Sequence, residues 1–180
     1  MEAMNDRVMY TTDYIYNLPD GQRAELIDGQ IYAMSLPSFR HQKIVVELST
    51  IINNYIKGNN GFCEVLPAPF AVFLNQDDKN YVEPDISVIC DKNKLDERGC
   101  NGAPDWIIEV VSPGSKRMDY FIKLFKYRTA GVREYWIVDP KKEIVIVYDF
   151  DGETMEEYTF ADKIKVAIYG DLEIDFSEIK

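Results

Sequence analysis

Two acidic residues are placed in this sequence where they could bind a metal ion. Asp85 begins an apolar run at residues 86–90, and Glu109 lies inside residues 105–111, a run that is apolar on both faces. Such a run predicts a central strand of a sheet that is covered on both sides. An unpaired ionised carboxylate buried there costs several kcal/mol. Glu109 therefore needs a compensating partner, either a metal ion or a cation such as Arg133 in a structural pair.

A metal ion explains both acidic residues together. Alone, Asp85 would be an aspartate that ends a loop, where this residue type is common. Two carboxylates at the same end of adjacent strands can hold one Mg²⁺ or Mn²⁺ and leave its other positions to water and a substrate phosphate. Such an ion polarises a phosphoryl oxygen and lowers the pKa of an attacking water. Asp85 and Glu109 thus predict a divalent metal cofactor.

The elements that must position these residues follow from the hydrophobic pattern and the turn signals. In chain order the pattern predicts a hairpin at 24–35, a helix at 39–57 capped by Ser38, strands at 62–66, 70–74, 86–90 and 105–111, a helix at 115–130, and strands at 134–138, 143–150 and 154–160. The strand–helix–strand unit from 105 to 138 predicts a parallel pair with a right-handed crossover. In the helix at 115–130, Phe121, Leu124 and Phe125 share one face and Lys123 lies on the opposite side. The fold class is α/β, with a mixed sheet and additional antiparallel strands toward the C-terminus.

The bulk composition indicates one domain over residues 1–180, with an N-terminal arm at 1–20 and a C-terminal extension at 161–180. Hydrophobic residues make up 46% of the chain, enough for a sizeable core. No apolar stretch is long enough to span a membrane, and residues 1–10 lack the apolar region of a secretory signal. The three cysteines, Cys63, Cys90 and Cys100, have no zinc or redox spacing. Reduced thiols and a cytoplasmic location are the simplest interpretation.

The charge distribution bears on possible partners. The formal net charge is −11, and an acidic protein should be repelled by phosphate backbones. The segment 139–180 holds 12 acids and 5 bases, a net charge of −7, whereas segment 115–133 holds six bases and one acid, net +5. Lys116, Arg117 and Lys126 of the basic segment could contact nucleic acid, although such a run is usually a solvated face.

The ordered series of short motifs resembles a known family. Pro84-Asp85 followed by Glu109-Val110-Val111 resembles the PD-(D/E)xK pattern of restriction-endonuclease-like nucleases. More specifically, the chain resembles the Uma-type family of restriction-endonuclease-like proteins. The resemblance covers roughly residues 20 to 140 and is carried by Glu25-Leu26-Ile27-Asp28-Gly29, Pro37-Ser38 with His41, Glu83-Pro84-Asp85-Ile86-Ser87-Val88, Glu109-Val110-Val111-Ser112-Pro113, Asp119 with Lys123 and Tyr127, and Ala130-Gly131-Val132 with Glu134-Tyr135-Trp136.

The resemblance implies a restriction-endonuclease-like core and assigns roles to the residues of the site. Asp85 and Glu109 would hold Mg²⁺ or Mn²⁺ with help from the Val110 carbonyl. Position 111, where the pattern has a lysine, is Val111, and the family places its lysine at Lys123. Lys123 would stabilise the charged transition state or position the water. A simpler alternative is an exposed i,i+4 pair with Asp119, worth a few tenths of a kcal/mol.

Two further residues, His41 and Glu25, are open to two interpretations each. His41, the only histidine, could act as a ligand, an acid or base, or a phosphate contact, or could be a surface residue at a helix start. Glu25 could be a further carboxylate near the metal or a plain hairpin residue. Tyr127 belongs to the same family motif as Lys123.

Two hypotheses about function follow. The first is a metal-dependent endonuclease that hydrolyses phosphodiester bonds, with DNA as the expected nucleic acid and a homodimer expected from analogy. The second is a non-catalytic member of the fold that acts as a binding or assembly module. The net charge of −11 and the valine at position 111 motivate the second hypothesis, which expects Glu109 to be satisfied by a protein cation.

Overall fold

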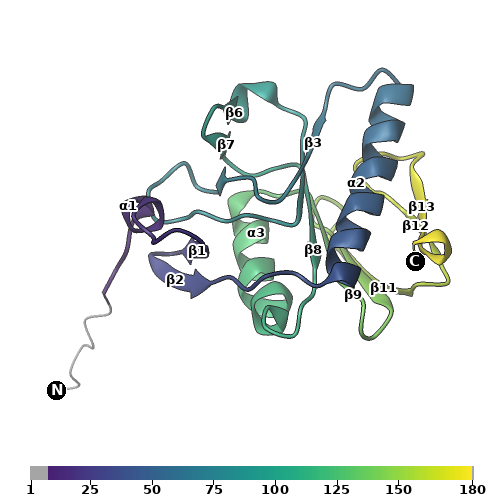
Figure 1. The fold of residues 1–180 in the computed structure, drawn as a ribbon. Coiled ribbons are helices and arrows are strands. Elements are labelled where there is room, and N and C mark those ends of the chain that lie inside the picture. Colours follow the sequence, from purple (N-terminus) through teal and green to yellow (C-terminus); the bar gives the residue numbers. More distant parts are fainter. Residues whose placement is uncertain (1–7, 180) are drawn as a thin grey trace.

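One six-stranded mixed sheet organises the computed structural model, which describes residues 8–179 (Figure 1). Its strand order is β11-β10-β9-β8-β5-β3. The strands of this sheet are β3 (Glu64–Pro67), β5 (Ile86–Ile89), β8 (Trp106–Val110), β9 (Glu134–Asp139), β10 (Ile144–Asp149) and β11 (Thr154–Thr159). The predicted α/β class with a mixed sheet is confirmed.

β8, which the sequence predicted to be a central strand, lies between β9 and β5 in this sheet. β8 pairs with β5 in an antiparallel register that sets Ile108 opposite Ile86. On its other side β8 runs parallel to β9, with Trp106 opposite Glu134. The other ladders of the sheet are antiparallel. The parallel pair that the strand–helix–strand unit predicted is therefore present.

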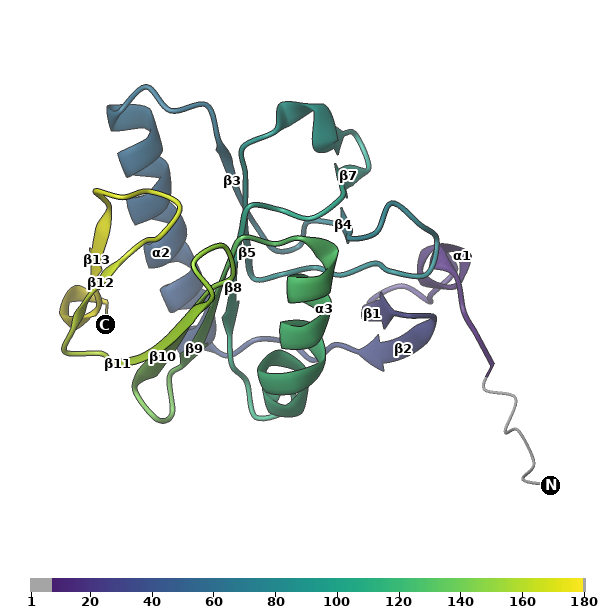
Figure 2. The same cartoon turned by 180° about the vertical axis from the view of Figure 1, so that it is seen from behind.

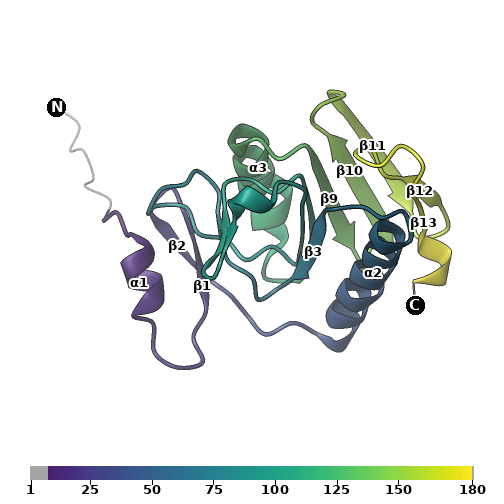
Figure 3. The same ribbon diagram turned by 90° about the horizontal axis from the view of Figure 1, so that it is seen from above.

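A long helix covers one face of the sheet and a shorter one covers the other, as the view from above shows (Figure 3). The long helix is α2 (Phe39–Gly58), whose cap Ser38 accepts a hydrogen bond from the His41 backbone N–H, as predicted. The shorter one is α3 (Leu124–Ala130), which ends at Gly131 in the left-handed conformation. The α2 face packs around Trp106 and Trp136. Glu109 alternates with its neighbours along β8 and so lies on the α3 side.

Smaller elements surround this core. The hairpin of β1 (Ala24–Ile27) and β2 (Gln30–Ala33) lies beside α3, with α1 (Thr12–Tyr16) at its outer side (Figure 2). Residues 1–7 lie outside the described residues. They include the rest of the predicted N-terminal arm and most of the segment that was considered as a secretory signal. The C-terminal extension forms β12 (Lys163–Lys165), β13 (Glu173–Asp175) and the 3₁₀ turn η3 (Phe176–Glu178), and its apolar residues join the α2-side core.

The helix predicted at 115–130 differs from expectation in two ways. It begins with a π-helical turn, η2 (Met118–Lys123), before α3 continues it. Phe121 and Phe125, which the periodicity placed on the apolar face, are each 70% exposed, whereas Lys123 is 4% exposed. The polar face points inward because buried carboxylates on neighbouring strands attract the lysine. This orientation of the helix leaves the two phenylalanine side chains exposed to solvent.

The region from 70 to 102 contains more regular structure than predicted. The strand expected at 70–74 is only β4 (Val72–Phe73), and it leaves the main sheet. It pairs with β7 (Gly99–Asn101), which in turn pairs with β6 (Leu95–Asp96). The 3₁₀ turn η1 (Lys92–Lys94) precedes β6. Residues 95–101, where the hydrophobic pattern predicted no strand, are therefore part of a small three-stranded sheet.

The prediction of reduced thiols is wrong for two of the three cysteines. Cys63 and Cys90 form a disulfide between the ends of β3 and β5. These strands pair with Glu64 opposite Ile89, which brings the flanking cysteines together although 27 positions separate them. Sequence spacing alone could not reveal this pairing. Cys100 is a free, buried thiol.

Each helix within residues 8–179 is too short or too polar to cross a lipid bilayer.

Candidate active site

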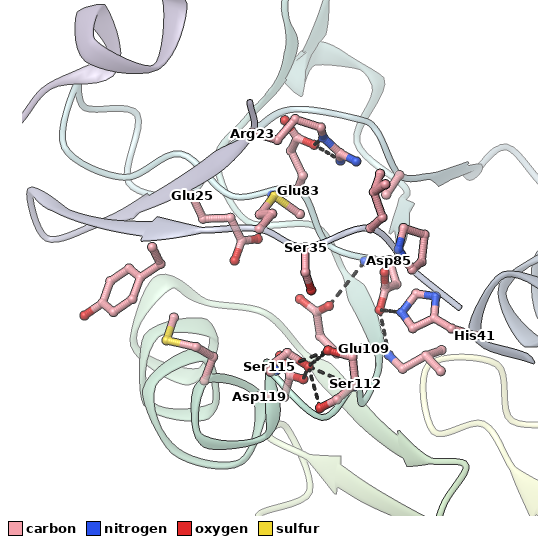
Figure 4. A pocket seen from close by; sticks show the side chains of 18 of the residues that line it. Arg23, Glu25, Ser35, His41, Glu83, Asp85, Glu109, Ser112, Ser115 and Asp119 are labelled. Atoms are coloured by element: carbon pink, nitrogen blue, oxygen red, sulfur yellow. Dashed lines mark hydrogen bonds and ion pairs between the residues drawn. The ribbon is translucent and has the colours of Figure 1, made fainter. Parts of the chain in front are cut away.

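Asp85 and Glu109 come together at one end of β5 and β8. Asp85 directly precedes β5, and the register that pairs Ile86 with Ile108 places Asp85 beside Glu109. The backbone N–H of Asp85 lies 3.4 Å from Oε2 of Glu109. The structure thus brings the two predicted carboxylates together, and both line one cavity (Figure 4).

Asp85 is held by groups from both sides. Its Oδ2 accepts a hydrogen bond of 2.8 Å from the backbone N–H of Val110 and lies 3.1 Å from Nε2 of His41. His41 comes from the first turn of α2, where the Ser38 cap fixes its backbone. Within the described chain no group bonds Oδ1 of Asp85, which leaves one carboxylate oxygen available to a ligand.

His41 is a mostly buried histidine rather than a surface residue. Burial lowers its pKa, but the hydrogen bond and the negative charge of Asp85 outweigh burial and raise the pKa above the ordinary value of 6.5. The imidazole can therefore carry a proton beside Asp85 close to neutral pH. Of the two interpretations of His41, the structure supports a place in the site.

Glu109 is buried, and one of its two carboxylate oxygens is bonded by donors from the helix that follows β8. Its Oε1 accepts hydrogen bonds from Lys123 Nζ at 2.9 Å and from the Tyr127 hydroxyl at 2.6 Å. Burial raises the pKa of Glu109 well above its ordinary value; Lys123 opposes the rise and the neighbouring carboxylates, Asp85 foremost, add to it. Arg133, considered as a partner for Glu109, instead pairs with Asp105 and Asp151 near the surface.

Lys123 is the centre of a cluster of carboxylates. Its ammonium lies 2.9 Å from Glu25 Oε2, 2.9 Å from Glu109 Oε1 and 3.8 Å from Asp119 Oδ1. Burial lowers the pKa of Lys123, but the surrounding carboxylates, Glu109 first, outweigh burial and raise it well above the ordinary value. The alternative of an exposed Asp119–Lys123 pair is therefore wrong.

Glu25 takes part in the same cluster, so it is more than a plain hairpin residue. It is 4% exposed and reaches the site from β1. While Oε2 meets Lys123, Oε1 accepts the backbone N–H of Glu83 at 3.0 Å. The hairpin is thereby tied to the strand end that carries Asp85.

Asp119 belongs to the site, although it was not among the predicted site residues. It is 1% exposed, lines the cavity, and accepts a 2.5 Å hydrogen bond from the Ser115 hydroxyl through Oδ2. Its Oδ1 is buried without a hydrogen-bond partner among the described residues. Burial raises the pKa of Asp119 to about 6, against the attraction of Lys123. The sequence signal was its i,i+4 spacing to Lys123 inside the family motif.

The cavity at this site has a volume of about 280 Å³ and is lined by residues from the hairpin, α2, the segment before β5, β8 and η2. Five carboxylates, Glu25, Glu83, Asp85, Glu109 and Asp119, line it together with Arg23 and Lys123. When all five are ionised and His41 is neutral, the cluster carries an excess of negative charge, which favours the binding of protons or of a metal cation.

The donor set is compatible with a hard divalent cation. Asp85 and Glu109 each have one oxygen, Oδ1 and Oε2, without a strong hydrogen bond. Within residues 8–179 no three His, Cys, Asp or Glu side chains form a ready metal cage. Mg²⁺ fits such a partial set, because it commonly binds one or two carboxylates and keeps several waters.

The predicted nucleic-acid contacts are not part of this cluster. Lys116 and Arg117 are exposed in the segment before η2. Lys126 is buried and its ammonium lies 2.6 Å from Asp28 Oδ1. It therefore ties α3 to the hairpin turn and is not free to meet a phosphate, contrary to the expectation for it.

A known protein family matches most of this chain. Residues 11–175 match the Uma2 family, described as "Putative restriction endonuclease". The chain belongs to the Uma2 family. The resemblance noted in the sequence is thus confirmed, and membership supports a nuclease as the general function.

Two known proteins are similar to this Uma2 member, one in sequence and one in structure. "Uncharacterized protein slr1290" of Synechocystis sp. is 29% identical over 153 residues, which cover 83% of this chain and 79% of that protein. The crystal structure of a "putative nuclease belonging to DUF820" from Anabaena variabilis superposes with a TM-score of 0.75 at 22% identity, covering 94% of this chain and 96% of the other. At that identity the likeness establishes the fold.

Proposed function

We propose that this Uma2 member is a metal-dependent endonuclease that hydrolyses phosphodiester bonds in DNA. The observation that carries the proposal is the placement of Asp85 and Glu109 side by side in a cavity, each with an oxygen that no strong protein donor occupies. Mg²⁺ or Mn²⁺ held by these two side chains, with the Val110 carbonyl, would polarise the phosphoryl oxygen and lower the pKa of the attacking water.

The side chains around the two carboxylates keep them in place. The Val110 N–H and His41 orient Asp85, while Lys123 and Tyr127 orient Glu109. Because His41 lines the same cavity, its imidazole is placed to give a proton to, or take one from, a group bound beside Asp85.

Lys123 would act from inside the site, because its side chain is buried there and is not part of an exposed pair with Asp119. Its ammonium is bonded to two carboxylates, Glu25 and Glu109, so it reduces their mutual repulsion and fixes Glu109 toward the strand end. Since it also lines the cavity, its positive charge acts on any anionic transition state formed there.

The test is cleavage of plasmid DNA with Mg²⁺ or Mn²⁺ by the wild type, Asp85→Asn and Glu109→Gln. Loss of several kcal/mol of metal-derived stabilisation predicts a fall of at least about 100-fold in rate for either variant. The control is Asp20→Asn, which removes an exposed carboxylate and should cleave like the wild type. Titration calorimetry of the same metals should show binding to the wild type that Glu109→Gln loses.

The non-catalytic alternative retains one supporting observation, because Glu109 is satisfied by a protein cation, Lys123. Cleavage that is unchanged in both variants, together with no metal binding by the wild type, would favour a binding or assembly module. A homodimer, in which two sites meet two strands, and a cytoplasmic location remain parts of this proposal.

A further inference from the structure

A second groove opens directly beside the candidate active site. Its volume is about 490 Å³, and it lies between the start of α2, the turn after β8, and the turn between β9 and β10. The two hollows share lining residues, among them Ser35, His41 and Ser112. The two hollows are therefore adjacent, and a chain-like ligand seated at the carboxylates would reach this groove next.

The charged side chains that line the groove are cationic, in contrast to the carboxylates of the site. Arg40 and Lys141 line it. Lys142 and Lys116 extend the positive surface, since their ammonium groups lie 5.5 and 6.0 Å from the centre of the same ring, Tyr120. These cations come from three separate segments of a chain whose net charge is −11, so only the fold gathers them.

The turn that presents the two lysines is fixed from within by a buried aspartate. Asp139 is 3% exposed. Its Oδ1 accepts the backbone N–H groups of Lys141 and Lys142, both at 3.1 Å, and its Oδ2 accepts the Tyr120 hydroxyl at 3.1 Å. The oxygens of Asp139 are thereby occupied, and both lysine side chains remain exposed.

The balance of charge around the groove favours an anion. Arg40 pairs with Glu143 at 2.9 Å across the rim, but both side chains are more than half exposed, so the pair is worth little and can open. Lys141 has no side-chain partner among the described residues. The residues that line the groove thus include the cations Arg40 and Lys141, and none of these lining residues is acidic.

We propose that this groove binds the phosphodiester backbone of a nucleic-acid strand next to the phosphate held at Asp85 and Glu109. The inference rests on the proposed function and adds the path of the substrate. The residues expected to contact nucleic acid are then Arg40 and Lys141 in place of Lys126, with Lys116 at the edge of the surface. An acidic protein can bind DNA in this way because the phosphate contacts are local to the groove.

The test is binding without turnover. The affinity of a fluorescently labelled oligonucleotide of mixed sequence, single- and double-stranded, is measured by anisotropy in EDTA over a range of salt concentrations. The variant is Arg40→Ala/Lys141→Ala. The matched control is Lys57→Ala/Lys92→Ala, which also removes two exposed cations, one of them paired with an exposed glutamate. Lys57 lies 17 residues beyond Arg40 on α2, about 25 Å away along the helix.

The magnitude follows from the release of counterions. Each phosphate contact contributes about 0.7 to the salt slope for single strands and about 0.9 for duplex DNA, so two lost contacts lower the slope by about 1.4 to 1.8. If electrostatic attraction vanishes near 1 M salt, the affinity at 0.1 M falls about 25- to 60-fold. The control should keep the wild-type slope and affinity.

The outcome is separable from that of the proposed function. Equal slopes for the groove variant and the control, or no salt-dependent binding by the wild type, would overturn the groove assignment. A selective loss in the groove variant would support it, even if the Asp85 and Glu109 substitutions showed that the protein does not cleave DNA.

Discussion

Replacing Asp119 by asparagine should make the protein more stable at neutral pH, although the residue lines the candidate active site. Asp119 is buried, one of its oxygens has no hydrogen-bond partner among the described residues, and burial raises its pKa from 3.8 to about 6. Asparagine has nearly the same shape and can still accept the hydrogen bond from Ser115.

The sign and size of the effect follow from proton linkage. Between pH 4 and pH 6 the folded wild type retains a proton on Asp119 that the unfolded chain has lost, so wild-type stability falls as the pH rises. One pKa unit corresponds to 1.36 kcal/mol, so the shift of about two units amounts to about 3 kcal/mol. Below pH 4 the variant and the wild type should be about equally stable. Above pH 6 the variant should be more stable by up to about 3 kcal/mol.

The assay is urea unfolding in EDTA between pH 4 and pH 8, followed by the fluorescence of Trp106 and Trp136, which are fully buried. The quantity of interest is the difference in unfolding free energy between Asp119→Asn and the wild type at each pH. Asp20→Asn serves as the control and should show no such rise. A difference that stays flat from pH 4 to pH 8 would refute the argument that burial raises the pKa of Asp119.

Two other substitutions test the architecture around the site. Lys123→Met should lower the free energy of unfolding by about 3–5 kcal/mol at pH 8, because it leaves buried carboxylates without their cation; the loss should shrink at pH 5, where Glu109 and Asp119, whose pKa values are raised, take up protons. An equal loss at both pH values would contradict this account. Ser38→Ala removes the cap of α2 and should cost about 1 kcal/mol, seen as a lower urea midpoint; an unchanged midpoint would show that the cap is not needed.

Local sequence patterns predicted most of the regular elements of this protein. The hairpin at β1–β2, the helix capped by Ser38, and the strands that follow Asp85 and contain Glu109 all occur where apolar spacing and turn residues placed them. Local rules succeed there because the apolar residues that define those elements are also the residues that the core buries. They failed where polar groups are buried instead: the face of Phe121 and Phe125 points outward and that of Lys123 inward.

The sequence by itself determined that Glu109, within an apolar strand, required a compensating partner, and its pattern paired Glu109 with Asp85. The family resemblance added Lys123 and Tyr127. Only the tertiary structure decided how these groups share their charges. The disulfide between Cys63 and Cys90, the cluster of Glu25, Asp119 and Lys123, and the cationic groove at Arg40 and Lys141 all join residues far apart in the chain or turned to an unexpected side. Such contacts depend on strand register and on which helix face is buried, and both are set by the whole core.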